Sequence, residues 1–282
     1  MSGNDTGATA QPETRGRNFY RMDRSLQGML RLYLPEAEQL HLVPHLERLG
    51  GLVGARLDDL ARDADRYTPV LHHRDRDGAD RQRVDYHPAY REMEQLAFGE
   101  FALAAMSHRA ALGWDRPLSS LSKYALTYLF AQSEFGLLCP VNMTDSLTRT
   151  IRRHAEPELL ERYLPRLLAD DPARMYQGAM FMTELQAGSD VGATMTRAVR
   201  SGGHWLLTGE KWFCSNVDCD LALVLARPEG AEAGTRGLGL FLLPRHLENG
   251  TPNSYKIVRL KEKLGTRGMA SGEIRLEGAL AW

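Results

Sequence analysis

Cysteine, long apolar runs and an excess of charge of one sign are all scarce in this sequence. Its 282 residues include three cysteines, Cys139, Cys214 and Cys219, an odd number without the spacing of zinc ligands. We therefore expect reduced thiols rather than a disulfide framework or a metal site. No apolar stretch approaches the length of a membrane span, and the N-terminus has no hydrophobic signal core. These absences predict a cytoplasmic protein with no membrane partner.

The charge balance excludes a strong general attraction to polyanions. Lys and Arg together number 35 against 36 Asp and Glu, which leaves a net charge of −1. Such a chain has no overall pull toward nucleic acid or an anionic membrane surface. A hydrophobic content of 43% is ordinary for a globular protein, and the length allows a large core in one or two domains.

Composition divides the chain into three parts. Residues 1–17 are polar and predict a disordered lead. Residues 18–172 carry apolar side chains at helical spacing and predict a helical domain. In residues 173–282, short apolar runs alternate with Gly-rich turns, which is typical of a small antiparallel barrel or sandwich. The sequence therefore predicts an α+β fold, with an all-helical N-terminal domain followed by a middle β domain.

Several helix boundaries can be predicted within the first domain. Asp23 is placed to cap a helix, and Pro35 to start the next one. The pair Gly50-Gly51 predicts a break before a further helix. Longer helices are expected over residues 87–112 and 118–135.

The segment between Tyr67 and His87 is rich in Arg, Asp and His. Its densest part, His72 to Asp77, contains side chains of the kind that bind metals. Charge-rich connectors are usually solvated, so we expect a loop here rather than a metal site.

Two stretches in the second domain suit a ligand. Met180 to Asp190 begins as an apolar strand and then changes to small and polar residues, where Gly188 allows positive φ and close approach and Ser189 adds a hydroxyl suited to a phosphate. Gly209 to Asn216 combines a strand, two aromatic residues and a terminal hydroxyl. From the residues alone, a plain turn and a plain aromatic core explain these patterns as well.

These two stretches resemble the flavin-contacting pair of the acyl-CoA dehydrogenase family. A third stretch, Lys261 to Ser271, is similar to a family string at the same place in the order. Val84 to Ala89 and Ala131 to Thr144 resemble the AidB-like branch of that family, although helix-end packing explains Cys139-Pro140 and Met143 equally well. Three strings in the family order make a specific match.

The resemblance implies FAD as the cofactor and assigns roles around it. Ser215 would direct its hydroxyl to the flavin N5 edge, Phe213 would lie against the flavin face, and Cys214 between them would offer backbone contacts only. Phe213 stands where many family members have Trp, which matches the AidB-like branch and makes a typical fatty-acyl substrate less certain.

Further roles follow from the same resemblance. Met182 and Thr183 would hydrogen-bond the pyrimidine side of the flavin, and Gly188 with Ser189 would lie by the pyrophosphate or the bound thioester, so that Thr183 and Ser189 also serve the substrate. Other residues of these stretches are expected to act structurally. In the first stretch, Glu184 is expected to be a structural carboxylate rather than a base. In the third, Lys261, Lys263 and Arg267 are expected to hold a turn, with a phosphate contact as the weaker alternative.

Three functions remain open at this point. The first is an acyl-CoA dehydrogenase-type oxidoreductase that acts on an acyl-CoA-like thioester, passes electrons to a partner and forms a homotetramer when complete. The second is an AidB-like flavoprotein of the DNA alkylation response. The third is a folded remnant that binds no flavin. In the family, a C-terminal helical domain supplies the catalytic base and, in the AidB-like branch, the DNA-binding surface. We expect this chain to lack that domain and therefore to hold no catalytic base.

Overall fold

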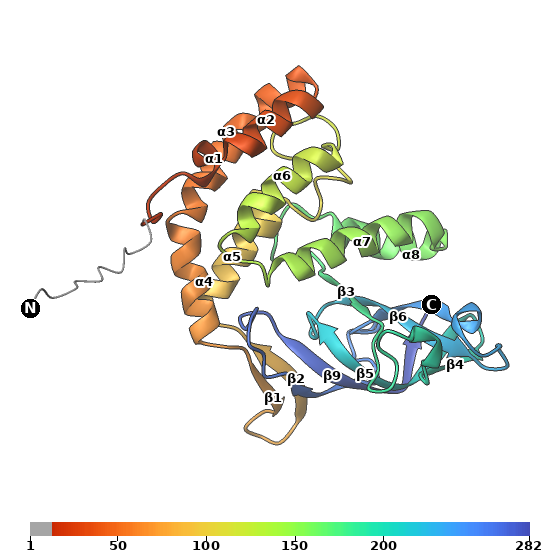
Figure 1. Cartoon of the computed structure of the whole chain (residues 1–282). Coiled ribbons are helices and arrows are strands. Elements are labelled where there is room, and N and C mark those ends of the chain that lie inside the picture. Colours follow the sequence, from red (N-terminus) through yellow and green to blue (C-terminus); the bar gives the residue numbers. More distant parts are fainter. Residues whose placement is uncertain (1–12) are drawn as a thin grey trace, which may run out of the picture.

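A computed structural model describes residues 13–282 as a layer of helices packed on a curled β-sheet (Figure 1). This arrangement confirms the predicted α+β class. The helices of the first layer, in chain order, are α1 (Phe19–Met22), α2 (Arg24–Tyr33), α3 (Glu36–Val53), α4 (Arg56–Arg66), α5 (Pro88–Glu94), the π-helical segment η1 (Gln95–Glu100), α6 (Ser120–Ala131), α7 (Leu138–His154) and α8 (Pro157–Leu167).

The helix starts follow local capping chemistry. The Asp23 carboxylate accepts a hydrogen bond from the Leu26 backbone N–H at 2.7 Å, so the predicted cap of α2 is confirmed. Pro35 precedes the first residue of α3, as expected. The predicted break at Gly50-Gly51 is wrong, because α3 continues to Val53. A Cβ on Gly50 would lie 2.6 Å from the Tyr20 backbone nitrogen, so this glycine allows close packing of α1 on α3.

The predicted helix over residues 87–112 ends early. After η1 the chain folds into turns, with Ala102 and Leu112 at φ of 46° and 56°. Such left-handed conformations do not continue a helix. Residues Phe101 to Met106 are nonetheless buried, which explains their helix-like apolar pattern.

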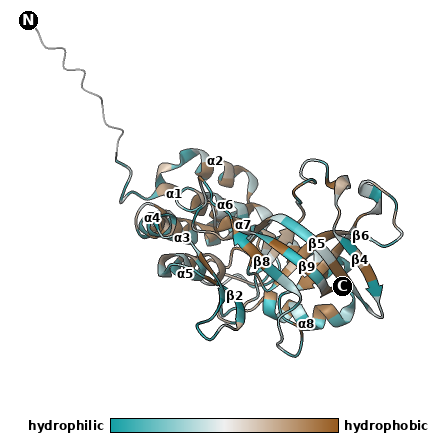
Figure 2. Cartoon of the chain, turned by 90° about the horizontal axis from the view of Figure 1, so that it is seen from below, coloured by the Kyte–Doolittle hydropathy of each residue, from teal (hydrophilic) through white to brown (hydrophobic). Residues whose placement is uncertain are grey.

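The β domain is a seven-stranded sheet whose strand order is β3-β6-β4-β5-β9-β8, with β7 also paired to β6. Most pairings are antiparallel, as predicted, but β6 pairs in parallel with β3 and β4. Figure 2 shows alternating hydrophilic and hydrophobic colours along β5 and β9, the pattern of strands with one buried face. The strands are β3 (Gly178–Phe181), β4 (Arg197–Ser201), β5 (His204–Ser215), β6 (Leu221–Pro228), β7 (Gly239–Pro244), β8 (Tyr255–Leu260) and β9 (Ser271–Ala281), with 3₁₀ turns η2 (Val191–Ala193) and η3 (Thr235–Gly237).

The charge-rich segment predicted as a loop forms a hairpin of β1 (Val70–Arg74) and β2 (Asp80–Asp85). Its polar side chains pair with each other across the turn, for example Arg81 Nε with Asp75 Oδ2 at 2.9 Å. The Gln82 side-chain oxygen accepts from the Ile257 N–H at 3.0 Å and ties the hairpin to β8. Within residues 13–282, no three His, Cys, Asp or Glu side chains converge to hold a metal ion.

Three apolar clusters form the interior. One fills the helical layer, one lies within the curled sheet, and the third joins them where α7 and α8 cover β3, β6 and β7. Leu147 on α7 and Leu221 on β6 are fully buried in this third cluster. Of the predicted lead over residues 1–17, residues 1–12 lie outside the described part, and Gly16 N–H donates to the Gly54 carbonyl at 2.6 Å. No helix of residues 13–282 has the length and apolar composition needed to cross a membrane.

Candidate functional site

Direct hydrogen bonds join the first two predicted strings. The Trp212 N–H donates to the Thr183 carbonyl at 2.9 Å, and Lys211 Nζ donates to the Met182 carbonyl at 3.1 Å. These bonds connect the end of β3 with β5, although the two strands are not neighbours in the sheet. Met182 and Thr183 therefore lie directly beside Lys211 and Trp212, and the second string continues from there along β5 to Ser215.

Glu184 holds the loop that follows β3. Its buried carboxylate accepts hydrogen bonds from Lys211 Nζ at 2.8 Å, from the Thr196 hydroxyl at 2.5 Å and from the backbone N–H groups of Met195 and Thr196. Burial alone would raise the pKa of Glu184, but the bonds from Lys211, Thr196 and Met195 outweigh it and hold the pKa below its usual value. A carboxylate so fully occupied serves the structure and not proton transfer.

The end of β5 presents one aromatic ring outward. The pairing of β5 with β9 shifts register between Lys211 and Cys214, an irregularity of the kind that redirects side chains. Phe213 is 57% exposed, whereas Cys214 beside it is fully buried. Lys261 Nζ lies 3.3 Å from the Trp212 ring centroid and 4.7 Å from that of Phe213. An aromatic core therefore does not explain Phe213, whose ring is accessible to a ligand.

Ser215 lies where the two layers meet. Its hydroxyl oxygen is 3.3 Å from the hydroxyl of Ser271, and the Ser215 side chain is one of the groups that lower the pKa of the Cys139 thiol on α7. The next residue, Asn216, turns the chain at φ 55° and is fixed by a bond from its side-chain amide to the Gly178 carbonyl at 3.2 Å. Asn tolerates this left-handed conformation better than most residues, which accounts for a Ser-Asn pair at the end of the strand.

Gly188 and Ser189 are exposed on the loop after Glu184. The loop closes on itself, since Glu184 N–H donates to the Ala187 carbonyl at 3.0 Å and Ala187 N–H donates back at 3.2 Å. A Cβ on Gly188 would meet nothing within 4 Å, and its φ is not positive. Gly188 therefore does not use the positive φ that glycine allows, while the open approach to its backbone remains. Within residues 13–282, no hydrogen bond joins Gly188 or Ser189 to Ser215.

The third string forms a turn between β8 and β9 that packs on the helical layer. Lys263 Nζ donates to the Met269 carbonyl at 2.6 Å and to the Ser271 hydroxyl at 3.2 Å, so Lys263 holds this turn. A Cβ on Gly268 would lie 3.2 Å from Ala64 Cβ, and one on Gly136 would lie 3.1 Å from Thr266 Cβ. The predicted AidB-like segment therefore contacts the third string directly.

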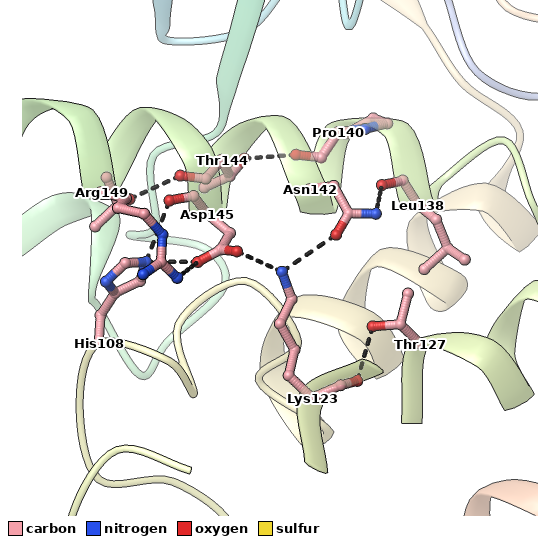
Figure 3. Close-up of polar contacts among 10 residues, drawn as sticks. His108, Lys123, Thr127, Leu138, Pro140, Asn142, Thr144, Asp145 and Arg149 are labelled. Carbon is pink, nitrogen blue, oxygen red and sulfur yellow. Dashed lines mark hydrogen bonds and ion pairs between the residues drawn. The ribbon is translucent and has the colours of Figure 1, made fainter. Parts of the chain in front are cut away.

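A buried polar cluster supports the same helix α7 (Figure 3). Asp145 accepts from Lys123 Nζ at 2.5 Å and lies 2.6 Å from His108 Nε2, while Arg149 approaches it at 3.5 Å. Asn142 accepts a second bond from Lys123 at 3.2 Å. Burial would raise the pKa of Asp145, yet the bonds from His108 and Lys123 outweigh it and lower that pKa. The cluster fixes α7 against α6 and the preceding loop.

Sequence reasoning did not find these partners. Lys123 and His108 stand in no motif, and burial of a lysine cannot be read from spacing. Cys139 was noted only as part of a family-like segment, and nothing in the sequence indicates that its thiol reaches Ser215. The one buried ion pair that the sequence did signal is that of Glu184, because its partner Lys211 is the Lys of the family-like string Gly-x-Lys.

The residues at this site fit a flat cofactor such as a flavin. Phe213 offers an accessible ring, Ser215 a hydroxyl beside it, and Thr183 a hydroxyl without a partner within residues 13–282. The open backbone at Gly188 leaves room for a phosphate. Such a set of one apolar face and a few polar groups is typical of cofactor sites.

Comparison with known proteins agrees with this architecture. Residues 10–177 match the family model described as the adaptive response protein AidB N-terminal domain, and residues 179–279 match the acyl-CoA dehydrogenase middle domain. Solved members of the acyl-CoA dehydrogenase family share this arrangement of a helical domain followed by a curled sheet. The chain belongs to the acyl-CoA dehydrogenase family, in its AidB-like branch.

Similar proteins come from distant organisms. Acyl-CoA dehydrogenase family member 11 of Caenorhabditis elegans is 32% identical over 285 residues, covering 98% of this chain and 46% of that protein. The putative acyl-CoA dehydrogenase AidB of Escherichia coli K12 is 35% identical over 237 residues, covering 79% and 41%. The crystal structure of C. elegans ACDH-11 in complex with C11-CoA superposes with a TM-score of 0.85 at 31% identity, covering 100% and 48%. The chain thus spans about half the length of the relatives it matches.

Proposed function

We propose that this chain forms the FAD-contacting and thioester-contacting surface of an acyl-CoA dehydrogenase-type oxidoreductase. The observation that carries the proposal is the Trp212–Thr183 hydrogen bond, which brings the two strings together with Phe213 and Ser215 on the same edge. When bound, FAD would accept the hydride that leaves Cβ of an acyl thioester. Family membership and the C11-CoA bound by the C. elegans relative support this substrate class.

Each side chain has a role that its surroundings allow. The exposed Phe213 ring packs against the flavin, and the Ser215 hydroxyl donates to its N5 edge. Cys214 is buried, so only its backbone is offered. The carbonyls of Met182 and Thr183 are occupied by Lys211 and Trp212, which leaves their N–H groups and the Thr183 hydroxyl for the pyrimidine side.

The exposed loop completes the surface. Gly188 and Ser189 hold the pyrophosphate or the thioester, and Thr183 and Ser189 also contact the substrate. No residue of this chain is assigned as the catalytic base, because the carboxylate of Glu184 is fully occupied. In the family the base comes from the C-terminal helical domain, which follows the two domains matched here.

The proposal extends to organisation and partners. We assign residues 18–172 to the helical domain and 173–282 to the β domain. An electron-transfer partner and a homotetramer follow from the family. A cytoplasmic location is supported by the three free thiols, Cys139, Cys214 and Cys219.

A second candidate is an AidB-like, DNA-associated flavoprotein with little dehydrogenase activity. It is favoured by the match of residues 10–177 to the AidB N-terminal domain. The DNA contact would belong to the C-terminal domain of the family, so this chain alone should not shift duplex DNA in a gel. A gel shift at physiological salt would instead show that residues 1–282 contain a DNA-binding surface.

The test of the proposed function is the visible spectrum of the purified chain after dialysis against FAD. Bound flavin, with its absorption bands retained after dialysis against buffer, is the expected result. A protein that remains colourless would overturn the assignment of these strings as a sufficient flavin site.

A further inference from the structure

Lys263 differs from the other cations of its turn. Lys261 Nζ pairs with Glu273 at 2.6 Å, and Arg267 approaches Asp65 at 3.7 Å. Lys263 forms no ion pair within residues 13–282, although its ammonium is half-buried. Burial lowers the pKa of Lys263 to about 8, against the charges of Cys139 and Glu134, which act to raise it. The group therefore remains mainly a cation at neutral pH.

The hydrogen bonds from Lys263 have a definite direction. An ammonium can only donate, so the Ser271 hydroxyl oxygen must accept from Lys263 Nζ at 3.2 Å. The Ser271 hydrogen is then free for the Ser215 oxygen at 3.3 Å, since the alternative acceptor, Met269 Sδ, is weak and 3.6 Å away. With its oxygen accepting, Ser215 keeps its own hydrogen for a further acceptor, such as the nearby Cys139 thiolate or a bound ligand.

We propose that Lys263, acting through Ser271, is a positioning residue that keeps the Ser215 hydroxyl in the donor orientation toward a ligand with a hydrogen-bond acceptor edge. This inference rests on the proposed function for the identity of that ligand, the flavin edge. Lys263, Ser271 and Ser215 form the path: Lys263 lies on the turn between β8 and β9, Ser271 begins β9, and Ser215 ends β5.

Cys139 offers a probe that needs no flavin. Its thiol is partly accessible, while Cys214 and Cys219 are buried. Burial raises the pKa of the Cys139 thiol, and hydrogen bonding by Ser215 and the charge of Lys263 offset part of that rise. Other charged groups near this point are Glu134 on the segment before α7, Asp65 on α4, and Arg267 on the turn.

The first experiment follows alkylation of Cys139 by iodoacetamide between about pH 7 and pH 10 in the full chain, because only the thiolate reacts. Lys263→Met should slow the reaction at pH 8 by roughly fivefold and Ser271→Ala by about twofold. Lys263→Arg carries a charge that does not titrate in this range, so its reaction at pH 8 should be at least as fast as in the wild type. Lys256→Met is the matched control, because Lys256 is exposed on β8 and should leave the profile unchanged.

A purely structural role for Lys263 predicts a different result. Lower thermal stability with an unchanged Cys139 profile in Lys263→Met would overturn the relay. Because the charge of Lys263 also acts on the Cys139 thiol directly, Ser271→Ala decides the question whether or not Lys263→Met folds: it removes one oxygen and leaves the bond from Lys263 to the Met269 carbonyl. A profile of Ser271→Ala equal to that of the wild type then rejects the inference.

The second experiment adds FAD in its oxidised and reduced forms. Reduction places a hydrogen on N5, so a donor hydroxyl directed at that atom favours the oxidised ring, and Ser271→Ala should weaken binding of oxidised FAD about tenfold more than that of reduced FAD. Equal losses for both forms would reject the link to the flavin edge. Failure of the unaltered chain to bind FAD would instead reject the proposed function, while the Cys139 profile still decides the relay.

Discussion

Lys211 Nζ lies 2.8 Å from Glu184 Oε1, and the two side chains are only 0% and 2% exposed. This pair joins the loop after β3 to strand β5 directly beneath the Thr183–Trp212 hydrogen bond. A buried ion costs several kcal/mol unless a partner and further hydrogen bonds compensate. Here the backbone donors of Met195 and Thr196 supply those bonds, so the shape of the proposed flavin surface depends on both charges.

Removing one member of this pair should destabilise the protein strongly. Lys211→Met leaves the Glu184 carboxylate buried without its cation, and the free energy of unfolding should fall by about 3–5 kcal/mol. Urea unfolding at neutral pH measures the change. The control is Arg275→Met, which breaks the exposed pair of Arg275 on β9 with Glu210 on β5, whose side chains are 51% and 62% exposed. That change should cost less than about 1 kcal/mol. Similar losses in both variants would contradict the structural importance of the buried pair.

Structural features that depend only on residues close together in the chain could be predicted from the sequence. The Asp23 cap depends on one side chain and the N–H three residues later, and the α+β order depends on a change of apolar periodicity. The adjacency of the two flavin-like strings was predicted through family resemblance and not through spacing. It depends on the contact of the segment after β3 with β5, two strands that are not neighbours in the sheet, and no local pattern encodes that contact.

Structural features that depend on contacts between residues far apart in the chain could not be predicted in this way. Gly50 was taken as a helix breaker, but its lack of a Cβ serves the contact with Tyr20, about thirty residues earlier in the chain. The hairpin of β1 and β2 lacks an apolar alternation and is held by Gln82 against β8. Burial of Lys123, Lys211 and Lys263 likewise depends on the packing of separate elements.

The two roles of helical glycine predict opposite effects of adding a methyl group. Gly28→Ala in α2 meets open space and should stabilise by about 0.5–1 kcal/mol, because alanine is the better helix former. Gly50→Ala would place its Cβ 2.6 Å from the Tyr20 nitrogen and should destabilise by about 1–3 kcal/mol. Thermal unfolding of both variants checks the prediction. A stabilising Gly50→Ala would show that α1 does not pack on α3 in this way.

The buried cluster around Asp145 should make the free energy of unfolding depend on pH in the acidic range. Hydrogen bonds hold the pKa of Asp145 below its usual value, so its contribution is present above about pH 4 and is lost as the pH falls further. Asp145→Asn leaves the Lys123 ammonium buried without a counter-ion and should cost about 3–5 kcal/mol at pH 7. The difference from wild type should shrink near pH 3, as shown by guanidinium unfolding. Asp77→Asn, at an exposed position, is the control. If the loss in stability of Asp145→Asn were independent of pH and no larger than that of Asp77→Asn, this role of Asp145 would be contradicted.

The buried carboxyl of Asp220 should give the stability of the protein the opposite pH dependence. Burial raises its pKa to about 6, and the nearby Asp218 adds to the shift. The folded state therefore binds more protons than the unfolded state between about pH 4 and pH 6, and stability falls as the pH rises through this window. Asp220→Asn can still accept the bond from the Gln177 N–H and should be more stable than wild type by on the order of 2 kcal/mol at pH 7, with little difference at pH 4. Unfolding curves at the two pH values decide.

Gly188→Val tests the phosphate-contacting loop without disturbing the fold. Because a Cβ at this position meets nothing within 4 Å and φ is not positive, the folded chain should accept valine with a change in stability of less than about 1 kcal/mol. A ligand that approaches the backbone there would collide with the branched side chain, so affinity for FAD should fall at least about tenfold. Gly203→Val, in the equally open turn between β4 and β5, is the matched control and should retain FAD. Equal FAD affinity in both variants, measured by fluorescence titration, would remove Gly188 and its neighbour Ser189 from the proposed site.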